Sequence, residues 1–297
     1  MEIDGTHIED TFAEAFRMRY VRLVVTAADE HWLDAGLREF TGYSSSIISC
    51  DSETGLERLL ARDETPDGRP GAATLVFGFS AESLAKVVPN RVGQCLMTCP
   101  TTAVFDGLTD GEARIALGKT IRYFGDGYQK SKLIGGRRYW RIPVMDGEFL
   151  IESMVHVDKG VGGGNLIVQA ATQAAALAAA RRAIAAIEPL PGVITPFPGG
   201  VARSGSKVGS RYKALKASTA ESYCPSLRGR PEVQTRLADG ANVAYEIVID
   251  GVSESAVAAA MAAGVRAAAG PNVVAISAGN YGGKLGKFHF HLRELVG

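Results

Sequence analysis

A strand-then-helix pattern occurs twice in this chain of 297 residues, at positions 143 residues apart. The β-branched run at 21–27 precedes helical spacing over 29–40, and the apolar run from Asn165 precedes helical spacing over 172–187. Superimposing the two patterns places apolar residues on apolar residues and Arg38 on Arg181. The identity is weak but the polarity agrees, which predicts an internal duplication.

Each half of the chain continues with a second strand–helix–strand pattern. The expected elements are a strand at 73–79, a helix at 81–88 and a strand at 93–98, and then a strand at 243–250, a helix at 254–269 and a strand at 272–277. Two such patterns per half predict an α+β protein made of βαββαβ sandwiches. We expect an N-terminal lobe over 1–155, which contains an inserted β-meander at 119–153, and a C-terminal lobe over 156–297. The glycine-rich segment 154–164 is expected to join them.

The charge balance excludes several classes of function. Lys plus Arg and Asp plus Glu each number 32, so the formal net charge is zero and gives no global argument for binding nucleic acid or a membrane surface. No apolar stretch approaches the roughly 20 residues that span a bilayer. Residues 1–10 do not resemble a signal peptide, and the four cysteines are expected to be reduced. We therefore expect a cytoplasmic protein.

Several partial motifs do not meet the requirements of known sites. Residues 160–165 resemble a dinucleotide fingerprint but precede a strand, and residues 200–207 resemble a phosphate loop but carry Ser-Lys in the wrong order. Cys95 and Cys99 lack a second pair at metal spacing. His289 and His291 are expected to face the same way, but no third ligand is evident, so we predict no metal site.

Glu246 is a lone carboxylate within an apolar strand over 243–249. It shares one face with Ala244 and Val248, while Tyr245, Ile247 and Ile249 form the other face. Loss of solvation would raise the pKa of Glu246, as in a catalytic acid. A buried ion pair with Arg or Lys would lower this pKa instead, and periodicity alone does not separate the two alternatives.

Two glycine-rich loops carry basic side chains. One loop spans 196–213 and the other spans 277–287. Glycine lets backbone N–H groups approach a ligand, and lysine or arginine binds carboxylates and phosphates. The loops therefore predict a site for a small anionic molecule.

The sequence resembles the formylmethanofuran:tetrahydromethanopterin formyltransferase family along essentially its whole length. Eight blocks carry the resemblance, and they occur at 1–5, 8–16, 64–71, 124–129, 196–200, 206–210, 245–249 and 276–286. The family implies two ferredoxin-like lobes and a homo-oligomer, a dimer or tetramer with active sites between subunits. It also implies formyl transfer between methanofuran and tetrahydromethanopterin as co-substrates, with no bound cofactor or metal.

The resemblance also implies roles for particular residues. The strand Tyr-Glu-Ile-Val-Ile carries the family's catalytic glutamate, which is Glu246 in this chain. A carboxylic acid held neutral can donate to the formyl oxygen or carry a proton between the two nitrogens. The residues expected to bind or orient the substrates are Arg203, Ser206, Lys207, Asn280, Lys284, Asp126 and Gln129.

The neutral, arginine-rich and alanine-rich composition resembles the methylotrophic-bacterial branch of the family rather than its acidic archaeal members. That branch implies formyl transfer from formyl-tetrahydromethanopterin to methanofuran in formaldehyde oxidation and one-carbon metabolism. It also implies hydrolase subunits as partners in a formyltransferase/hydrolase complex. The alternative is a non-catalytic, carrier-binding subunit of such a complex, which would tolerate loss of Glu246.

Overall fold

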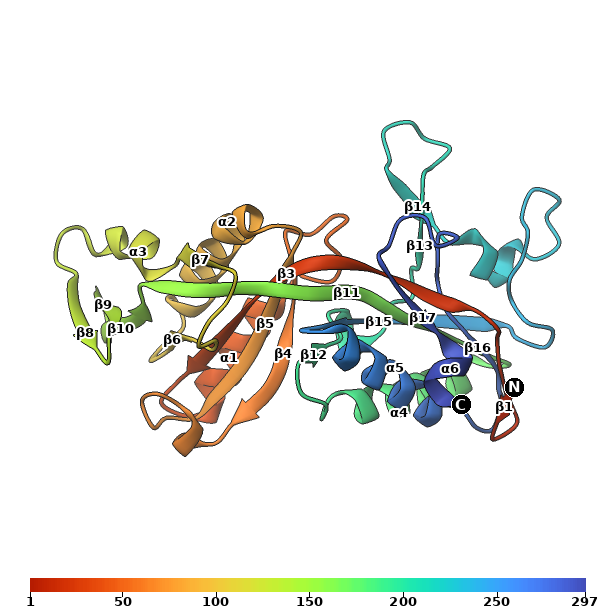
Figure 1. The fold of residues 1–297 in the computed structure, drawn as a ribbon, viewed down its shortest axis with the longest axis horizontal. Coiled ribbons are helices and arrows are strands. Elements are labelled where there is room, and N and C mark those ends of the chain that lie inside the picture. The colour runs from red at the N-terminus through yellow and green to blue at the C-terminus, as the bar shows by residue number, and fades with distance from the viewer. The chain divides into compact units, whose positions relative to one another are not determined.

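The computed structural model describes all 297 residues and divides into two compact units (Figure 1). Unit 1 contains Met1–Arg17 and Val161–Gly297, and unit 2 contains Met18–Gly160. Two long strands, β3 (Phe12–Thr26) and β11 (Met154–Ala170), contribute residues to both units. Residues 1–17 thus belong with the C-terminal half of the chain, whereas the expected division placed them in a lobe over 1–155. The difference arises because these residues pair with strands near the C-terminus.

Unit 2 has the predicted βαββαβ order. Its elements are β3, α1 (Glu30–Thr41), β4 (Glu53–Leu60), β5 (Gly71–Gly78), α2 (Ala81–Arg91) and β6 (Ala103–Asp106). The strands lie in the order β4–β5–β3–β6, with every neighbouring pair antiparallel. This is the ferredoxin-like arrangement. The predicted meander follows as β8 (Lys130–Ile134), β9 (Arg137–Val144) and β10 (Gly147–Glu152), after β7 (Ala113–Ala116) and the short helix α3 (Gly118–Ile121).

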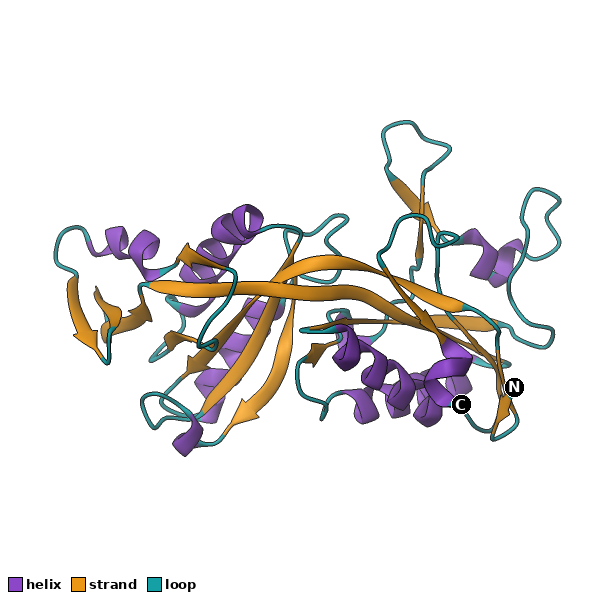
Figure 2. Cartoon of the chain, in the orientation of Figure 1, coloured by secondary structure: helices purple, strands orange, loops and turns teal.

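Unit 1 repeats this topology. Its elements are β11, α4 (Gln173–Ile187), β12 (Val193–Ile194), β15 (Val243–Gly251), α5 (Glu254–Ala268) and β16 (Val273–Ser277), with antiparallel strand order β12–β15–β11–β16. The chain ends extend it through β1 (Glu2–Ile3), β2 (Thr6–Ile8), β17 (Phe288–His291) and α6 (Leu292–Val296). Helices α4 and α5 cover one face of this sheet, and the connection 201–242, which carries the hairpin β13 (Ser206–Val208) and β14 (Ala217–Thr219), lies on the other side (Figure 2).

The helix starts confirm the internal duplication. Helices α1 and α4 begin at Glu30 and Gln173, which reproduces the offset of 143 residues, and the side chains of Asp29 and Thr172 cap them. The second helix of each unit, α2 or α5, is capped in the same way by a serine. In all four cases the cap side chain accepts a hydrogen bond from a backbone N–H three residues on. None of the helices has the length and apolarity needed to cross a membrane.

The predicted strand at 93–98 is wrong, because helix α2 continues into a π-helical segment, Val92–Leu96. Val88, Val92 and Leu96 are fully buried, and their spacing of four residues keeps them on one helical face. Pro89 lies inside the helix rather than at its end. The fourth strand of unit 2 is β6 instead.

The two units meet within the predicted segment 154–164, between Gly160 and Val161, but these residues form part of the strand β11 rather than a separate joint. The strand has an irregularity between Val161 and Gly164. Gly164 packs against helix α5, where the Val257 side chain occupies the space that a Cβ atom would need. Glycine therefore permits close approach of helix and sheet here, rather than flexibility.

We expect Gly164→Ala to lower the free energy of unfolding by about 1 to 3 kcal/mol, because the added methyl group overlaps the Val257 side chain. The matched control is Gly93→Ala, where the added carbon meets no heavy atom within 4 Å. This control should be neutral or should stabilise the protein by about 0.5 kcal/mol. Urea denaturation of both variants measures the difference, and equal stabilities would contradict the packing argument.

Candidate active site

Glu246 lies on the sheet face of unit 1 that the helices do not cover. Ile167 of β11 is paired with Glu246 of β15 on one side and with Ser277 of β16 on the other, so these three side chains share a face. Ile247 and Ile249 point the opposite way and are fully buried in the helix-covered core. The predicted alternation of strand β15 is therefore confirmed.

The Glu246 side chain is half-buried, and its carboxyl has no hydrogen-bond or ion-pair partner. Its backbone N–H and C=O both bond to Ala202, at 2.9 and 2.8 Å, which holds Ala202 beside the strand. A Cβ atom at Gly205 would lie 3.1 Å from Glu246 Oε2. No cation or hydrogen-bond donor of the chain adjoins the carboxyl, and burial alone raises the pKa of Glu246 to about 7. Of the two alternatives that the sequence left open, the structure supports the unpaired carboxyl.

A hydrogen-bonded polar network occupies the neighbouring part of this face. Glu9 accepts from Ser277 Oγ at 2.6 Å and from Gln169 Nε2 at 2.9 Å, and the Tyr223 hydroxyl lies 3.2 Å from Ser277 Oγ. The Ala238 N–H donates to Gln169 Oε1 at 2.8 Å. These contacts anchor the connection 201–242 to the sheet, so that its first residues stay beside Glu246.

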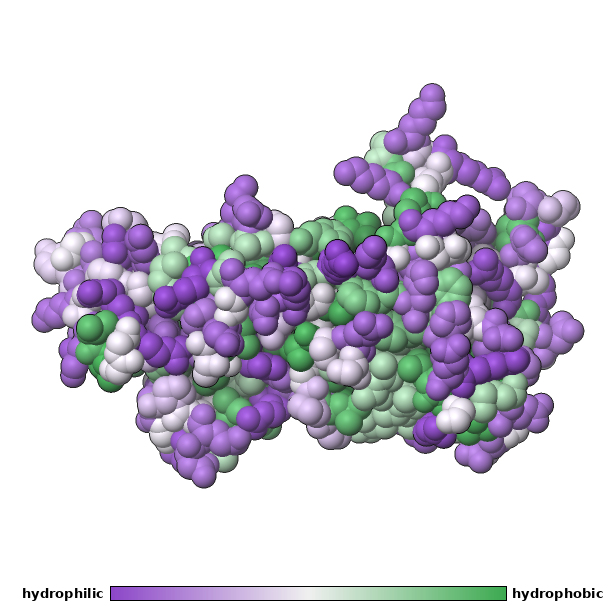
Figure 3. All heavy atoms as spheres, in the orientation of Figure 1, coloured by the Kyte–Doolittle hydropathy of each residue, from purple (hydrophilic) through white to green (hydrophobic).

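Three of the predicted substrate-binding residues lie in this connection. Ser206 directly follows Gly205, the residue next to the Glu246 carboxyl, and Arg203 precedes Gly205 by two positions. Lys207 is exposed on β13 and forms an ion pair with Glu221. Hydrophilic side chains surround the protruding hairpin β13–β14 (Figure 3). The connection thus places two basic residues within two positions of Gly205.

The second predicted loop connects β16 to β17 in the same unit. Lys284 is exposed there. The side chain of Asn280 bonds within the protein, where Nδ2 donates to Thr11 Oγ1 and the Phe12 carbonyl at 3.2 and 3.0 Å. Its role in orienting substrate stays a prediction. The sequence reasoning did not identify Glu14 and Asn165, whose side chains also bond this loop. In the sequence, the only sign of these two residues is that each is polar and lies in an expected strand, and such residues usually lie on an exposed face.

Asp126 and Gln129 lie in unit 2, at the turn that follows residues 122–125. Asp126 has a left-handed backbone conformation with φ of 50°, and Gln129 Oε1 accepts a hydrogen bond from the Gly127 N–H at 2.9 Å. Their side chains therefore shape a tight turn. A role for them in substrate binding stays a prediction.

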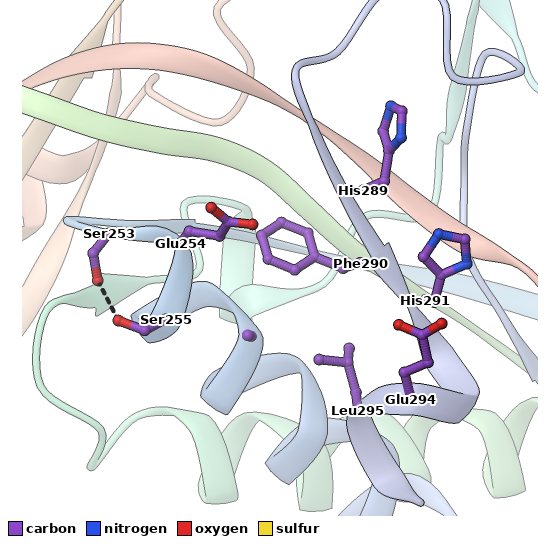
Figure 4. A pocket seen from close by; sticks show the side chains of 9 residues that line it. Ser253, Glu254, Ser255, His289, Phe290, His291, Glu294 and Leu295 are labelled. Carbon is purple, nitrogen blue, oxygen red and sulfur yellow. Dashed lines mark hydrogen bonds between the residues drawn. The ribbon is translucent and has the colours of Figure 1, made fainter.

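An open groove of about 580 Å³ lies elsewhere in unit 1, between β17 and the start of α5 (Figure 4). His289 and His291 line it and are both exposed on either side of the buried Phe290, as the sequence predicts. Their rings lie 5.0 and 5.2 Å from the Phe12 ring. None of the predicted site residues lines this groove.

Family models and full-length relatives identify the protein family to which this chain is related. The model described as formylmethanofuran-tetrahydromethanopterin formyltransferase matches residues 1–144, and the model of the proximal lobe of the same enzyme matches 147–295. The chain belongs to this family. A formylmethanofuran–tetrahydromethanopterin formyltransferase from Methylococcus capsulatus is 53% identical over 300 residues, with 100% of both chains covered. One subunit of the formyltransferase/hydrolase complex of Methylorubrum extorquens is 47% identical over 304 residues, covering 99% of this chain and 97% of the relative.

Solved structures of the formyltransferase family have the same fold. The formyltransferase from Methanosarcina barkeri superimposes with a TM-score of 0.93 at 45% identity, covering 99% of this chain and 100% of that one. The Methylorubrum extorquens formyltransferase/hydrolase complex, solved with methylofuran, contains a chain with a TM-score of 0.96 at 46% identity, covering 100% and 99%. The family resemblance and the α+β fold of two ferredoxin-like lobes are thereby confirmed.

Proposed function

We propose that this chain transfers a formyl group between formylmethanofuran and tetrahydromethanopterin, with Glu246 as the acid and base of the reaction. The observation that supports this role most directly is the partner-free Glu246 carboxyl, whose pKa of about 7 lets it hold and release a proton near neutrality. The names of the full-length relatives supply the substrates.

The chemistry is aminolysis of a formamide. The attacking nitrogen adds to the formyl carbon, negative charge develops on the formyl oxygen, and a proton passes from the attacking nitrogen to the departing amine. Neutral Glu246 donates a hydrogen bond to the formyl oxygen or a proton to the departing amine, and its carboxylate then accepts the proton of the attacking nitrogen. No redox step occurs, so the two co-substrates suffice and no further cofactor enters the balance.

The basic loops bind the anionic parts of the substrates in this proposal. Arg203, Ser206 and Lys207 lie within two positions of Gly205 in the chain, and Lys284 is exposed in the loop between β16 and β17. Carboxylates or phosphates distant from the formyl group would bind these side chains and hold the reacting atoms together. We also propose that Asp126 and Gln129 contribute to orientation of the substrates.

The physiological direction that we propose is from formyl-tetrahydromethanopterin to methanofuran. A relative with 47% identity is named as part of a formyltransferase/hydrolase complex, in which a hydrolase would consume the formylated carrier. Hydrolase subunits are therefore the proposed partners, together with further copies of this chain.

The direct test is formyl transfer by the purified chain, followed by absorbance of the pterin. We expect turnover when formyl-tetrahydromethanopterin and methanofuran are both present, and none when methanofuran is omitted. The same assay is repeated with hydrolase subunits added. Methanofuran binding without turnover in either assay would contradict the transferase and support the carrier-binding subunit.

A further inference from the structure

The loop between β16 and β17 of unit 1 has no regular secondary structure, yet it is held at many points. Residues 278–287 include four glycines, and Gly282 and Gly283 both have a φ of 72°. Such backbone conformations favour glycine and turn successive N–H groups towards one point. The group at that point is the carboxylate of Glu14.

Glu14 extends from β3 and is only 1% exposed. Its Oε2 accepts hydrogen bonds from the N–H groups of Tyr281 and Gly283, at 2.7 and 2.9 Å. Its Oε1 accepts from the N–H groups of Leu285 and Gly286, at 2.6 and 2.5 Å. One buried side chain thus binds four backbone groups of the loop.

The charge of Glu14 is stabilised by the backbone alone. Burial by itself would raise the pKa of Glu14, but the four N–H groups outweigh burial and hold this pKa below its ordinary value. A Cβ atom at Gly286 would lie 2.6 Å from the Cγ atom of Glu14, so the loop backbone needs glycine to come this close. The loop is therefore wrapped around a carboxylate whose ionised form its N–H groups favour.

The same loop runs beside Glu246. Asn165 receives a hydrogen bond from the Gly279 N–H at 2.6 Å and donates one to its carbonyl at 3.2 Å. Ile167 is the cross-strand neighbour of Glu246. Asn165 lies two residues before Ile167 in the same strand, so its side chain is on the same sheet face as that of Glu246. The pKa of the Tyr281 phenol is raised mainly by burial and, to a smaller extent, by the negative charge of Glu246. This effect of Glu246 on Tyr281 agrees with a position of the loop close to Glu246.

We propose that Glu14 is a positioning residue for formyl transfer, acting through the loop 279–286 to limit the access of water to the half-buried Glu246 carboxyl. This inference rests on the proposed function of Glu246. Glu14 itself touches no substrate in this scheme. It fixes the backbone of the loop, and the loop keeps the ring of Tyr281 packed 6.2 Å from the ring of Phe16.

The test uses Glu14→Gln, which keeps the size of the side chain but replaces one acceptor oxygen with an NH₂ group that opposes the N–H donors. We expect faster hydrogen exchange at the amides of Tyr281, Gly283, Leu285 and Gly286. With water admitted, the ¹³C NMR titration midpoint of the Glu246 carboxyl should fall by more than about one pH unit. The kcat at pH 7 should then fall about five- to tenfold, with a smaller change in KM.

The control is Val265→Ala, a truncation in the helix-covered core of the same unit. It should lower thermal stability without moving the Glu246 midpoint or the pH profile. A Glu14→Gln variant with faster loop exchange but an unchanged Glu246 midpoint would overturn the inference. Because the titration needs no turnover, an inactive wild-type chain would contradict the proposed function while still leaving Glu14 testable.

Discussion

Replacing Glu246 with glutamine should lower the kcat of formyl transfer by about 10²- to 10⁴-fold, the range that general acid–base catalysis contributes. Glutamine has nearly the same shape and can still donate a hydrogen bond, but it cannot release and recapture a proton. The surrounding contacts are made by the backbone of residue 246, through Ala202, and should survive the change. The variant should therefore remain folded.

The pH profile gives a second readout of the same role. If the protonated acid is the form that acts, the kcat/KM of the wild type should fall as the pH rises through about 7, the pKa of Glu246. Glu246→Gln should lack this inflection. The matched control is Glu188→Gln, which makes the same chemical change at an exposed position at the end of α4. Activity of Glu246→Gln within about threefold of the control would remove Glu246 from the mechanism.

The same substitution should stabilise the protein at alkaline pH. The pKa of Glu246 is about 7 in the folded protein and 4.5 for the unperturbed group. The folded state therefore binds the proton more tightly than the unfolded state does, and its stability falls as the pH rises from about 4.5 to 7. Above pH 7 the full cost of burying the charge, about 3 kcal/mol, is present. Glutamine carries no charge and escapes this cost.

Urea denaturation at pH 5 and pH 8 measures this effect. We compare the free energy of unfolding of Glu246→Gln with that of the wild type at each pH. The difference, variant minus wild type, should be about 2 to 3 kcal/mol larger at pH 8 than at pH 5. The control Glu188→Gln should show no such dependence, because its side chain is exposed. A constant difference between Glu246→Gln and the wild type at the two pH values would contradict the raised pKa. Loss of activity together with gain of stability is the combination expected of a catalytic acid held in an unfavourable site.

The sequence pattern predicted those elements whose conformation depends mainly on their own residues. The duplication offset of 143 residues was recovered in the helix starts because capping and amphipathic spacing are local properties. The strand predicted at 93–98 was wrong, and the strand conformation of 154–164 was not predicted, because both conformations depend on packing partners. Val92 and Leu96 continue a buried helical face, and Gly164 adjoins Val257.

In the candidate site, too, local features could be predicted from the sequence, whereas contacts with distant residues could not. Glu246 was identified as an unusual carboxylate from strand alternation, but the absence of a partner depended on residues 202–205, some 40 positions earlier in the chain. Glu14 was missed because alternation suggests an exposed glutamate, and its four donors lie more than 260 residues away. Asn280 was identified by motif position, yet its side chain bonds Thr11 and Phe12.

Because residues 1–17 belong to unit 1, the two units should fold at different times during translation. Strand β2 pairs with β16, residues 12–15 pair with β17, and Glu14 bonds residues 281–286. Residues 1–17 thus lack these partners until residues 273–291 have been synthesised. Unit 2 can condense earlier in translation, whereas the sheet edge and the loop beside Glu246 form only after residues 273–291 have emerged. The region around Glu246 should therefore mature after unit 2, and a chaperone that retains residues 1–17 would delay formation of this region rather than folding of unit 2.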